Sequence, residues 1–292
     1  MREYDRTLFA SPLVQVGAFR CGTDHRDFND TGPSQSYCFV FPRSAVWIHH
    51  DGSAPFVADP NVIPFYNAGK PYRRARISSE GDRTDWLAIS SELLREAVAV
   101  HDSHLSETHN LFKFSFSYAT PHQYLAQRRI FNHILTGAPD QLYVEEAVIA
   151  LLDDVLERAY SCNARFNSSR RHQELAQRAK EQLNRHLCSG ICLGALAASL
   201  ETSIFHLCRV FKHETGATIH QYRLVLKLHR SLELLEQEDT DILDVGLRVG
   251  FSSHSHFTRT FRRVFGVTPS QFRGQRWARF TECGKMAHSM SI

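Results

Sequence analysis

Between residues 10 and 90 the apolar residues stand in short alternating runs rather than at helical spacing. The runs are rich in Val, Ile, Phe, Tyr and Trp, and turn sequences such as Asp51-Gly52 and Glu80-Gly81-Asp82 separate them. This pattern predicts short strands that form a small barrel or sandwich. The expected strands are Leu13–Phe19, Tyr37–Phe41, Ala45–His49, Phe56–Ala58, Val62–Tyr66, Tyr72–Ile77 and Asp85–Ile89.

After Ile89 the apolar spacing changes to three and four residues, which predicts amphipathic helices. Helices are expected over Ser91–Val100, from Pro121 to the Gly137-Ala138-Pro139 stop, and over Gln141–Tyr160 and His172–Leu187. The run Ser161–Arg171 is polar and aperiodic, so it is predicted to be a linker. The last residues, 275–292, also lose periodicity and are expected to be disordered.

The C-terminal part of the chain contains an internal repeat. Ser203–Tyr222 aligns with Ser253–Phe272 at a shift of 50 residues, and seven of the 20 aligned positions are identical. Each copy has a short apolar-striped helix, a tight turn, a serine at the N-cap and a second helix that ends at glycine. The repeat therefore predicts two helix-turn-helix units joined by a long helix, over about residues 219–237.

The second helix of each unit has one apolar and one polar face. Leu207, Val210 and Phe211 are expected inside the first unit, and Phe257, Thr260 and Phe261 inside the second. A solvated face on a helical bundle is one interpretation of the polar side. Two copies at fixed separation favour another, in which both helices enter successive major grooves about 34 Å apart. The predicted DNA contacts are Phe205, Cys208, Arg209, His254, Ser255, Thr258 and Arg259 for bases, and Lys212, Arg262 and Arg263 for phosphate, although Arg209 and Arg259 can also meet phosphate.

The runs HLCRVFKHETG, DVGLRVGFSSHSHFTRTFRRVFG and VTPSQFR resemble the DNA-binding domain of AraC/XylS-family transcription regulators. The resemblance covers about Leu175–Arg273. The first unit departs from the pattern at its turn, where the shift is 49 residues and Glu201 stands in the place of Gly250. A left-handed backbone at that residue would cost about 1 kcal/mol. Phe205 and Cys208 are unusual groove-facing residues, which favours contacts with thymine methyl groups and the DNA backbone.

The runs VWIHH and DPNVIPFYNAGKPYRR resemble the cupin-like sensor domain that many AraC-type proteins carry. A small barrel can hold one small ligand. The candidate lining residues are Phe39, Trp47, His49, Tyr66, Arg74 and Trp86, although aromatic residues at strand spacing also suit an ordinary core. His49 and His50 are adjacent on a strand and point to opposite faces, so they cannot chelate a metal together. Neither a metal nor a cofactor is expected.

The net charge of +3 conceals an asymmetry between the two halves. Residues 1–170 contain 17 Lys and Arg against 20 Asp and Glu, whereas residues 171–292 contain 17 against 11, so the halves carry −3 and +6. A basic second half suits a phosphate-binding module. The seven cysteines form no CxxC pair, and the N-terminus has no apolar signal core. The chain is therefore expected to be cytoplasmic with reduced thiols, and Cys188 and Cys192 are expected to be ordinary ones.

These patterns together predict an α+β protein. Residues 1–160 are expected to form a cupin-like sensor and dimerisation domain, with a barrel over 10–90 and helices over 91–160. Residues 161–171 are the expected linker, and 172–274 the double helix-turn-helix domain. The predicted function is sequence-specific DNA binding and transcription regulation by an effector-controlled homodimer, with RNA polymerase as a further partner. The alternatives are a cupin-type metal-dependent enzyme fused to a helical module, and a regulator that binds DNA without an effector.

Overall fold

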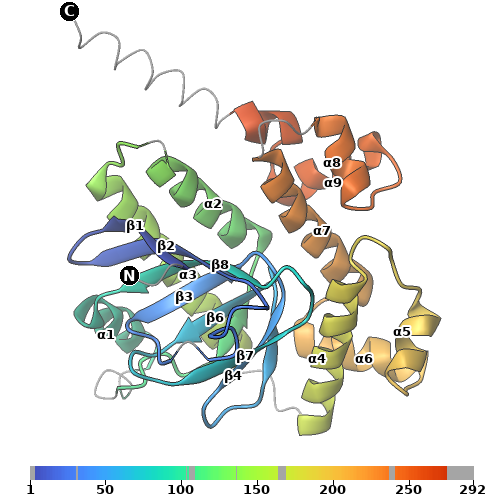
Figure 1. The fold of residues 1–292 in the computed structure, drawn as a ribbon, viewed down its shortest axis with the longest axis horizontal. Helices are drawn as coiled ribbons and strands as arrows, with labels where there is room; N and C mark the ends of the chain where they lie inside the picture. Colours follow the sequence, from blue (N-terminus) through green and yellow to red (C-terminus); the bar gives the residue numbers. More distant parts are fainter. Residues whose placement is uncertain are drawn as a thin grey trace, which may run out of the picture.

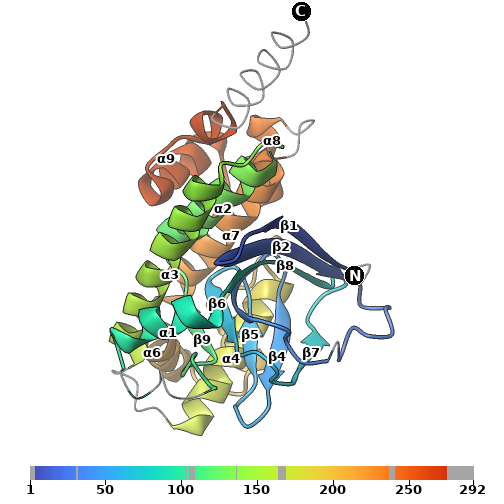
Figure 2. The ribbon, with the colours of Figure 1, turned by 90° about the vertical axis from the view of Figure 1, so that its left-hand side faces the viewer.

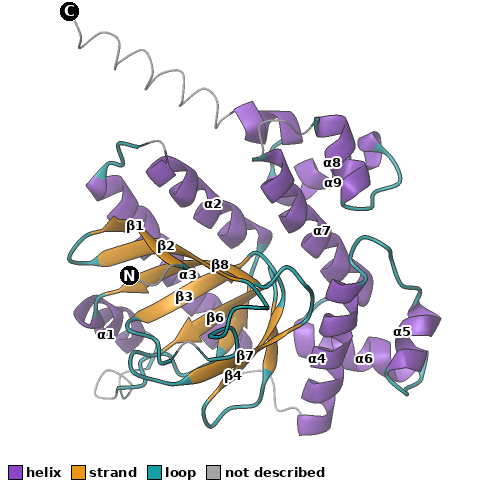
Figure 3. Cartoon of the chain, in the orientation of Figure 1, coloured by secondary structure: helices purple, strands orange, loops and turns teal. Residues whose placement is uncertain are grey.

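The protein combines an antiparallel β half with a helical C-terminal half (Figures 1 and 3). The computed structural model describes residues 4–30, 32–102, 104, 109–135, 137–163, 169–236 and 241–274. The expected tail, 275–292, lies outside these residues, as do 164–168 of the expected linker.

The strands form two antiparallel sheets. The larger has the order β1-β2-β8-β3-β6-β9, with strands Asp5–Ala10, Val14–Cys21, Asp82–Ile89, Tyr37–Pro42, Val62–Tyr66 and Phe116–Tyr118. The smaller has the order β5-β4-β7, with strands Phe56–Ala58, Val46–His50 and Tyr72–Arg76. Phe19 from the larger sheet packs in one buried cluster with Ile48 and Phe56 from the smaller. The sheets therefore face each other across an apolar layer.

Helices cover the other face of the larger sheet (Figure 2). These are α1 (Ser91–Ala99), α2 (Pro121–Leu135) and α3 (Gln141–Asn163). The C-terminal half consists of α4 (Arg170–Arg185), α5 (Leu193–Ser199), α6 (Ile204–Thr215), α7 (Ile219–Leu235), α8 (Ile242–Arg248) and α9 (His254–Phe265). Helix α7 joins the α5–α6 unit to the α8–α9 unit, as the repeat predicts (Figure 1).

One apolar core continues from the sheet into the C-terminal half. Leu87 of β8 and Phe131 of α2 belong to the same buried cluster as Leu232 of α7 and Phe257 of α9. The expected linker therefore does not separate two independent cores. Helix α3 also continues to Asn163, and α4 begins directly after its cap Ser169, so both helices extend into the expected linker.

Buried polar groups fix the N-terminal end of α7 to the sheets. Asp59, between β5 and β6, is fully buried and accepts hydrogen bonds from the Tyr222 hydroxyl at 2.9 Å and from the Asn184 amide at 2.8 Å. The Asn61 amide donates to the Tyr222 carbonyl at 2.9 Å. Lys180 of α4 is also buried and donates to the Val57 carbonyl at 2.7 Å. These bonds satisfy groups that would be costly to leave unpaired away from water.

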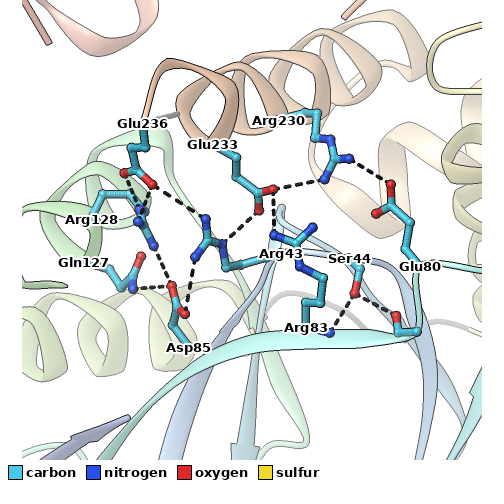
Figure 4. A network of polar contacts seen from close by, with 11 residues as sticks. Arg43, Ser44, Glu80, Arg83, Asp85, Gln127, Arg128, Arg230, Glu233 and Glu236 are labelled. Atoms are coloured by element: carbon cyan, nitrogen blue, oxygen red, sulfur yellow. Dashed lines mark hydrogen bonds and ion pairs between the residues drawn. The ribbon is translucent and has the colours of Figure 1, made fainter. Parts of the chain in front are cut away.

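A cluster of charges holds the C-terminal end of α7, and we call it the α7 clamp (Figure 4). Glu233 lies 2.9 Å from Arg43 Nε and 3.3 Å from Arg83 Nη2. Arg128 of α2 bridges Asp85 of β8, at 2.6 Å, to Glu236. The residues of the α7 clamp are Arg43, Glu80, Arg83, Asp85, Arg128, Arg230, Glu233 and Glu236. The two halves are thus joined at both ends of α7.

Two strands were not predicted from the sequence. β1 is half exposed on both faces and shows no alternation of apolar residues, while β9 has only three residues. Strand β8 begins at Asp82, three residues before the expected start. The sequence placed this start too late because the charged run Asp82-Arg83 resembles the end of a turn.

Candidate nucleic-acid interface

The same backbone devices build both helix-turn-helix units. The hydroxyls of Ser203 and Ser253 cap α6 and α9, accepting from the amides of His206 and His256 at 3.2 Å. Gly216 and Gly266 end these helices in the left-handed conformation, with φ of 72° and 75°. Glycine adopts this conformation at little cost because it lacks a Cβ atom. Thr218 then caps α7, and Thr268 caps the short helix over residues 269–274 with a matching pair of hydrogen bonds to Gln271.

The turns between the paired helices also begin in the same way. Glu201 has a φ of 53° and Gly250 a φ of 81°, so both lie in the left-handed region. Glu201 is the only non-glycine residue with positive φ among the described residues. The first turn is one residue shorter than the second but begins in the same left-handed conformation, and Glu201 bears the strain that the sequence predicts for a side chain at this position.

The predicted inner and outer faces of both helices are observed. Leu207, Val210 and Phe211 are buried in the first unit, as are Phe257, Thr260 and Phe261 in the second. The opposite faces are exposed or half-buried, and they include all ten predicted contact residues: Phe205, Cys208, Arg209, Lys212, His254, Ser255, Thr258, Arg259, Arg262 and Arg263. Because the cores fill the inner faces, these side chains are available to a partner.

The outer face is strongly cationic. Arg209 and Lys212 lie on α6, and Arg259, Arg262 and Arg263 lie on α9. No carboxylate among the described residues pairs with any of these five cations, in contrast to the arginines of the α7 clamp. Unpaired cations on exposed helix faces attract phosphate and release its counterions. Surface arginines and lysines that face an acidic duplex also accelerate its association.

An open groove runs beside α9. It has a volume of about 620 Å³ and is lined by His254, Ser255, Thr258, Arg259, Arg262, Arg263 and Thr268. Six of these seven residues are the predicted contacts of the second unit. His254 and Thr258 are one turn apart and lie within hydrogen-bond distance, 3.2 Å, which orders the polar edge of the groove.

Comparison with known proteins places this interface in a family. Residues 196–275 match the helix-turn-helix domain family. The chain is 38% identical over 92 residues to the probable transcription factor PqrA of Proteus vulgaris, and the match covers 32% of this chain and 74% of PqrA. The chain belongs to the AraC/XylS family of transcription regulators.

Two further matches also cover less than half of this chain. This AraC/XylS-family chain is 30% identical over 132 residues to the transcriptional activator RhaS of Klebsiella pneumoniae, covering 45% of the chain and 44% of RhaS. The chain thus spans less than half of the length of RhaS. A crystal structure of an AraC-type regulator from Chromobacterium violaceum is 31% identical, covering 37% of this chain and 96% of the other, with a TM-score of 0.35.

The N-terminal half of the AraC/XylS-family chain contains a cavity of about 380 Å³. Its wall includes aromatic rings from Tyr4, Phe19, Tyr66, Tyr72 and Trp86. Its polar wall includes Asp5, Cys38, Asp82 and Thr84. Burial raises the pKa of the Cys38 thiol to about 12, so this thiol stays protonated at neutral pH. The size and mixed lining are typical of a small-molecule site.

Only part of the predicted effector set lies at this cavity. Tyr66 and Trp86 line it, and Arg74 holds the lining residue Asp82 through a 3.3 Å ion pair. Phe39 instead points into the core beneath α2 and α3, and Trp47 packs beside Val57. The side chain of His49 is exposed. These three residues do not line the cavity because their strand positions face the opposite side.

Sequence reasoning missed the cavity residues Asp82, Thr84 and Tyr72. Alternation along β8 was the available signal, since Asp82, Thr84 and Trp86 share one face of the strand. Burial raises the pKa of Asp82, and the Arg74 guanidinium opposes that rise. Burial also lowers the pKa of His50 to about 4, so His50 is neutral at physiological pH.

The described residues of this AraC/XylS-family chain contain neither a metal-binding cluster nor a membrane-spanning helix. Within them, three or more His, Cys, Asp or Glu side chains never gather as a metal site would require. None of the described helices has both the length and the hydropathy needed to cross a membrane.

Proposed function

We propose that this chain is a sequence-specific DNA-binding transcription regulator that uses α6 and α9 in successive major grooves. One observation carries the proposal: two helices with the same serine caps, glycine ends and buried inner faces both expose unpaired arginines. A helix fits the major groove, and arginine can donate two hydrogen bonds to guanine O6 and N7. Helix α7 separates the two units at a fixed distance, which suits two half-sites on one duplex.

Selection of bound duplexes from a random pool tests this proposal. The full chain is the correct reagent, because the C-terminal half shares its core with the sheet. The expected result is two short motifs with centres about 10 to 10.5 base pairs apart. Arg259→Ala should weaken specific binding by about 1–3 kcal/mol and remove information from one motif, and Arg209→Ala should do the same to the other. A single motif unaffected by both variants, or no enrichment, would refute the proposal.

We further propose that a small effector in the 380 Å³ cavity controls DNA binding. Strand β8 supports this proposal because one of its faces lines the cavity and the other contributes residues to the α7 clamp. Thr84 and Trp86 face the cavity, whereas Arg83 and Asp85, on the opposite face, belong to the α7 clamp. A ligand that shifts β8 would therefore act on α7, the helix that spaces the two DNA-contacting helices.

A double-mutant cycle tests this coupling without knowledge of the effector. Val40→Phe fills the cavity from β3, and Asp85→Asn neutralises one group of the α7 clamp. If the cavity acts through the α7 clamp, filling it should change operator affinity in the wild-type background but much less in Asp85→Asn. Additive effects would separate the cavity from DNA binding and favour a regulator without an effector.

The remaining proposals concern assembly and the rival function. We propose that the protein is a cupin-like homodimer in the cytoplasm, with α2 and α3 at the dimer contact. Sedimentation of the full chain as a monomer at tens of micromolar would refute the dimer. A cupin-type metal-dependent enzyme is the rival, and stoichiometric iron or manganese in the purified protein would favour it.

A further inference from the structure

The outer faces of α6 and α9 have the same shape but different chemistry. Residues 207–215 and 257–265 follow the same order of buried, half-buried and exposed positions. Both helices begin after a serine cap and present an arginine, Arg209 or Arg259, one turn from their first exposed residues. The two helices therefore present equivalent positions outward, so side-chain chemistry at these positions can be compared directly.

The difference is concentrated in the first turn. In α6 this turn presents Ile204 and Phe205, which are 49% and 78% exposed. The equivalent residues of α9 are His254 and Ser255, and they line the polar groove beside that helix. One turn later Cys208 of α6 stands where α9 has Thr258. The first helix thus begins with an apolar surface, and the second with hydrogen-bonding groups.

The first turn of a groove-binding helix is the part that contacts base edges. In the major groove, thymine alone among the four bases presents a methyl group, and apolar side chains recognise it. A phenylalanine ring cannot donate or accept the hydrogen bonds that identify other bases, but its burial against methyl groups is favourable. Serine, threonine and histidine can hydrogen-bond to base edges instead.

We infer that the two units recognise their half-sites by different chemistry. The first unit recognises thymine methyl groups through Phe205, supported by Ile204, and Arg209 contacts a guanine edge beside them. The second unit recognises base edges through hydrogen bonds from Ser255, Thr258 and Arg259. The operator is therefore asymmetric, and only one half-site depends on thymine methyl groups. This inference rests on the proposed function and specifies the DNA sequence that the same helices bind.

Uracil substitution tests the inference directly. Deoxyuridine has the same hydrogen-bonding groups as thymidine and lacks only the methyl group. The probes are the selected operator with uracil in place of every thymine of one half-site, on both strands, and a second operator modified only in the other half-site. The half-site of the first unit is the one whose sequence information is lost in Arg209→Ala. Uracil there should lower affinity about fourfold for each methyl group that Phe205 covers, and uracil in the other half-site should have little effect.

Two matched variants separate this contact from general damage. Phe205→Ser gives the first unit the residue of the second, and it should abolish the difference between uracil and thymine. Ser255→Ala changes the equivalent position of α9, and it should leave that difference intact. Equal affinity for uracil and thymine at the first half-site, or equal losses at both half-sites, would overturn the inference, as would a first half-site without thymine. In those cases specific binding itself would survive, whereas failure to select any motif would count against the proposed function.

Discussion

Replacing Asp85 by asparagine is the sharpest test of how the two halves are joined. Asp85 of β8 is 2% exposed, and its carboxylate lies 2.6 Å from Arg128 Nη1 and 3.8 Å from Arg43 Nη1. The Gln127 amide also donates to it at 3.0 Å. Asparagine keeps the shape and one acceptor oxygen, so the variant removes the negative charge and little else.

The expected loss follows from the charges that remain. Removing one partner of a buried ion pair typically costs about 3–5 kcal/mol, because the other charge stays buried without compensation. Arg128 keeps Glu236 and Arg43 keeps Glu233, so the lower end applies. We therefore expect Asp85→Asn to lower the free energy of unfolding by about 3 kcal/mol.

Urea unfolding at pH 7.5 with two probes measures this loss. With Trp277 replaced by phenylalanine in every variant, Trp47 and Trp86 report on the sheets by fluorescence, and circular dichroism reports on the helices. The control is Glu174→Gln, which breaks an ion pair to Arg170 in which both side chains are more than half exposed, and it should cost less than about 1 kcal/mol. We expect the two probes to coincide in the wild type, because the core is shared. A loss in Asp85→Asn no larger than that of the control would refute the stabilising role of the α7 clamp.

Three further predictions address the pH response, the strained turn and the DNA contact. Burial lowers the pKa of His229, which stacks on Tyr124 at 4.0 Å, to about 3, and the backbone of Pro60 only partly opposes this. The unfolded chain therefore binds a proton near pH 6.5 that the folded protein excludes, so stability is lost as the pH falls. The loss from this residue should reach about 2 kcal/mol between pH 7.5 and 5, and His229→Phe should show a correspondingly weaker pH dependence in urea unfolding. Glu201→Gly should raise stability by about 1 kcal/mol because it relieves the left-handed strain, whereas Glu201→Ala should give no such gain. Lys212→Ala should weaken binding to all duplexes alike and reduce the slope of log affinity against log salt by about one, and a loss confined to the operator would contradict its assignment to phosphate.

The C-terminal half was predictable because its signals are local. The caps Ser203 and Ser253, the stops Gly216 and Gly266 and the apolar stripes all act within one or two turns of the residues that carry them. The repeat then doubled each signal. Even the strained turn at Glu201 was visible in the sequence, since only its alignment with Gly250 was needed.

The cavity was predicted less well because it depends on which face each strand turns toward the second sheet. Phe39 and Trp47 have the residue types of a binding site, yet both face other cores. Threonine is not a residue type that singles out a binding site, yet Thr84 lines the cavity. Strand pairing decides these positions: β8 lies between β2 and β3, and a register shift of one residue would reverse every side chain on it.

The α7 clamp shows why the contact between the two halves could not be predicted from the sequence. Arg43 and Glu233 are 190 residues apart in the sequence, and a charged residue of either type is normally expected at the protein surface. They become buried only because α7 lies across the ends of β3 and β8. Taken singly, Arg43 and Arg83 suggest a solvent-exposed edge of the barrel. In the structure they bind Glu233 and so attach the sheet to α7. The polar run over residues 161–171 therefore lies where α3 ends and α4 begins, and it does not separate two independent cores, because one apolar cluster joins the sheet to α7 and α9.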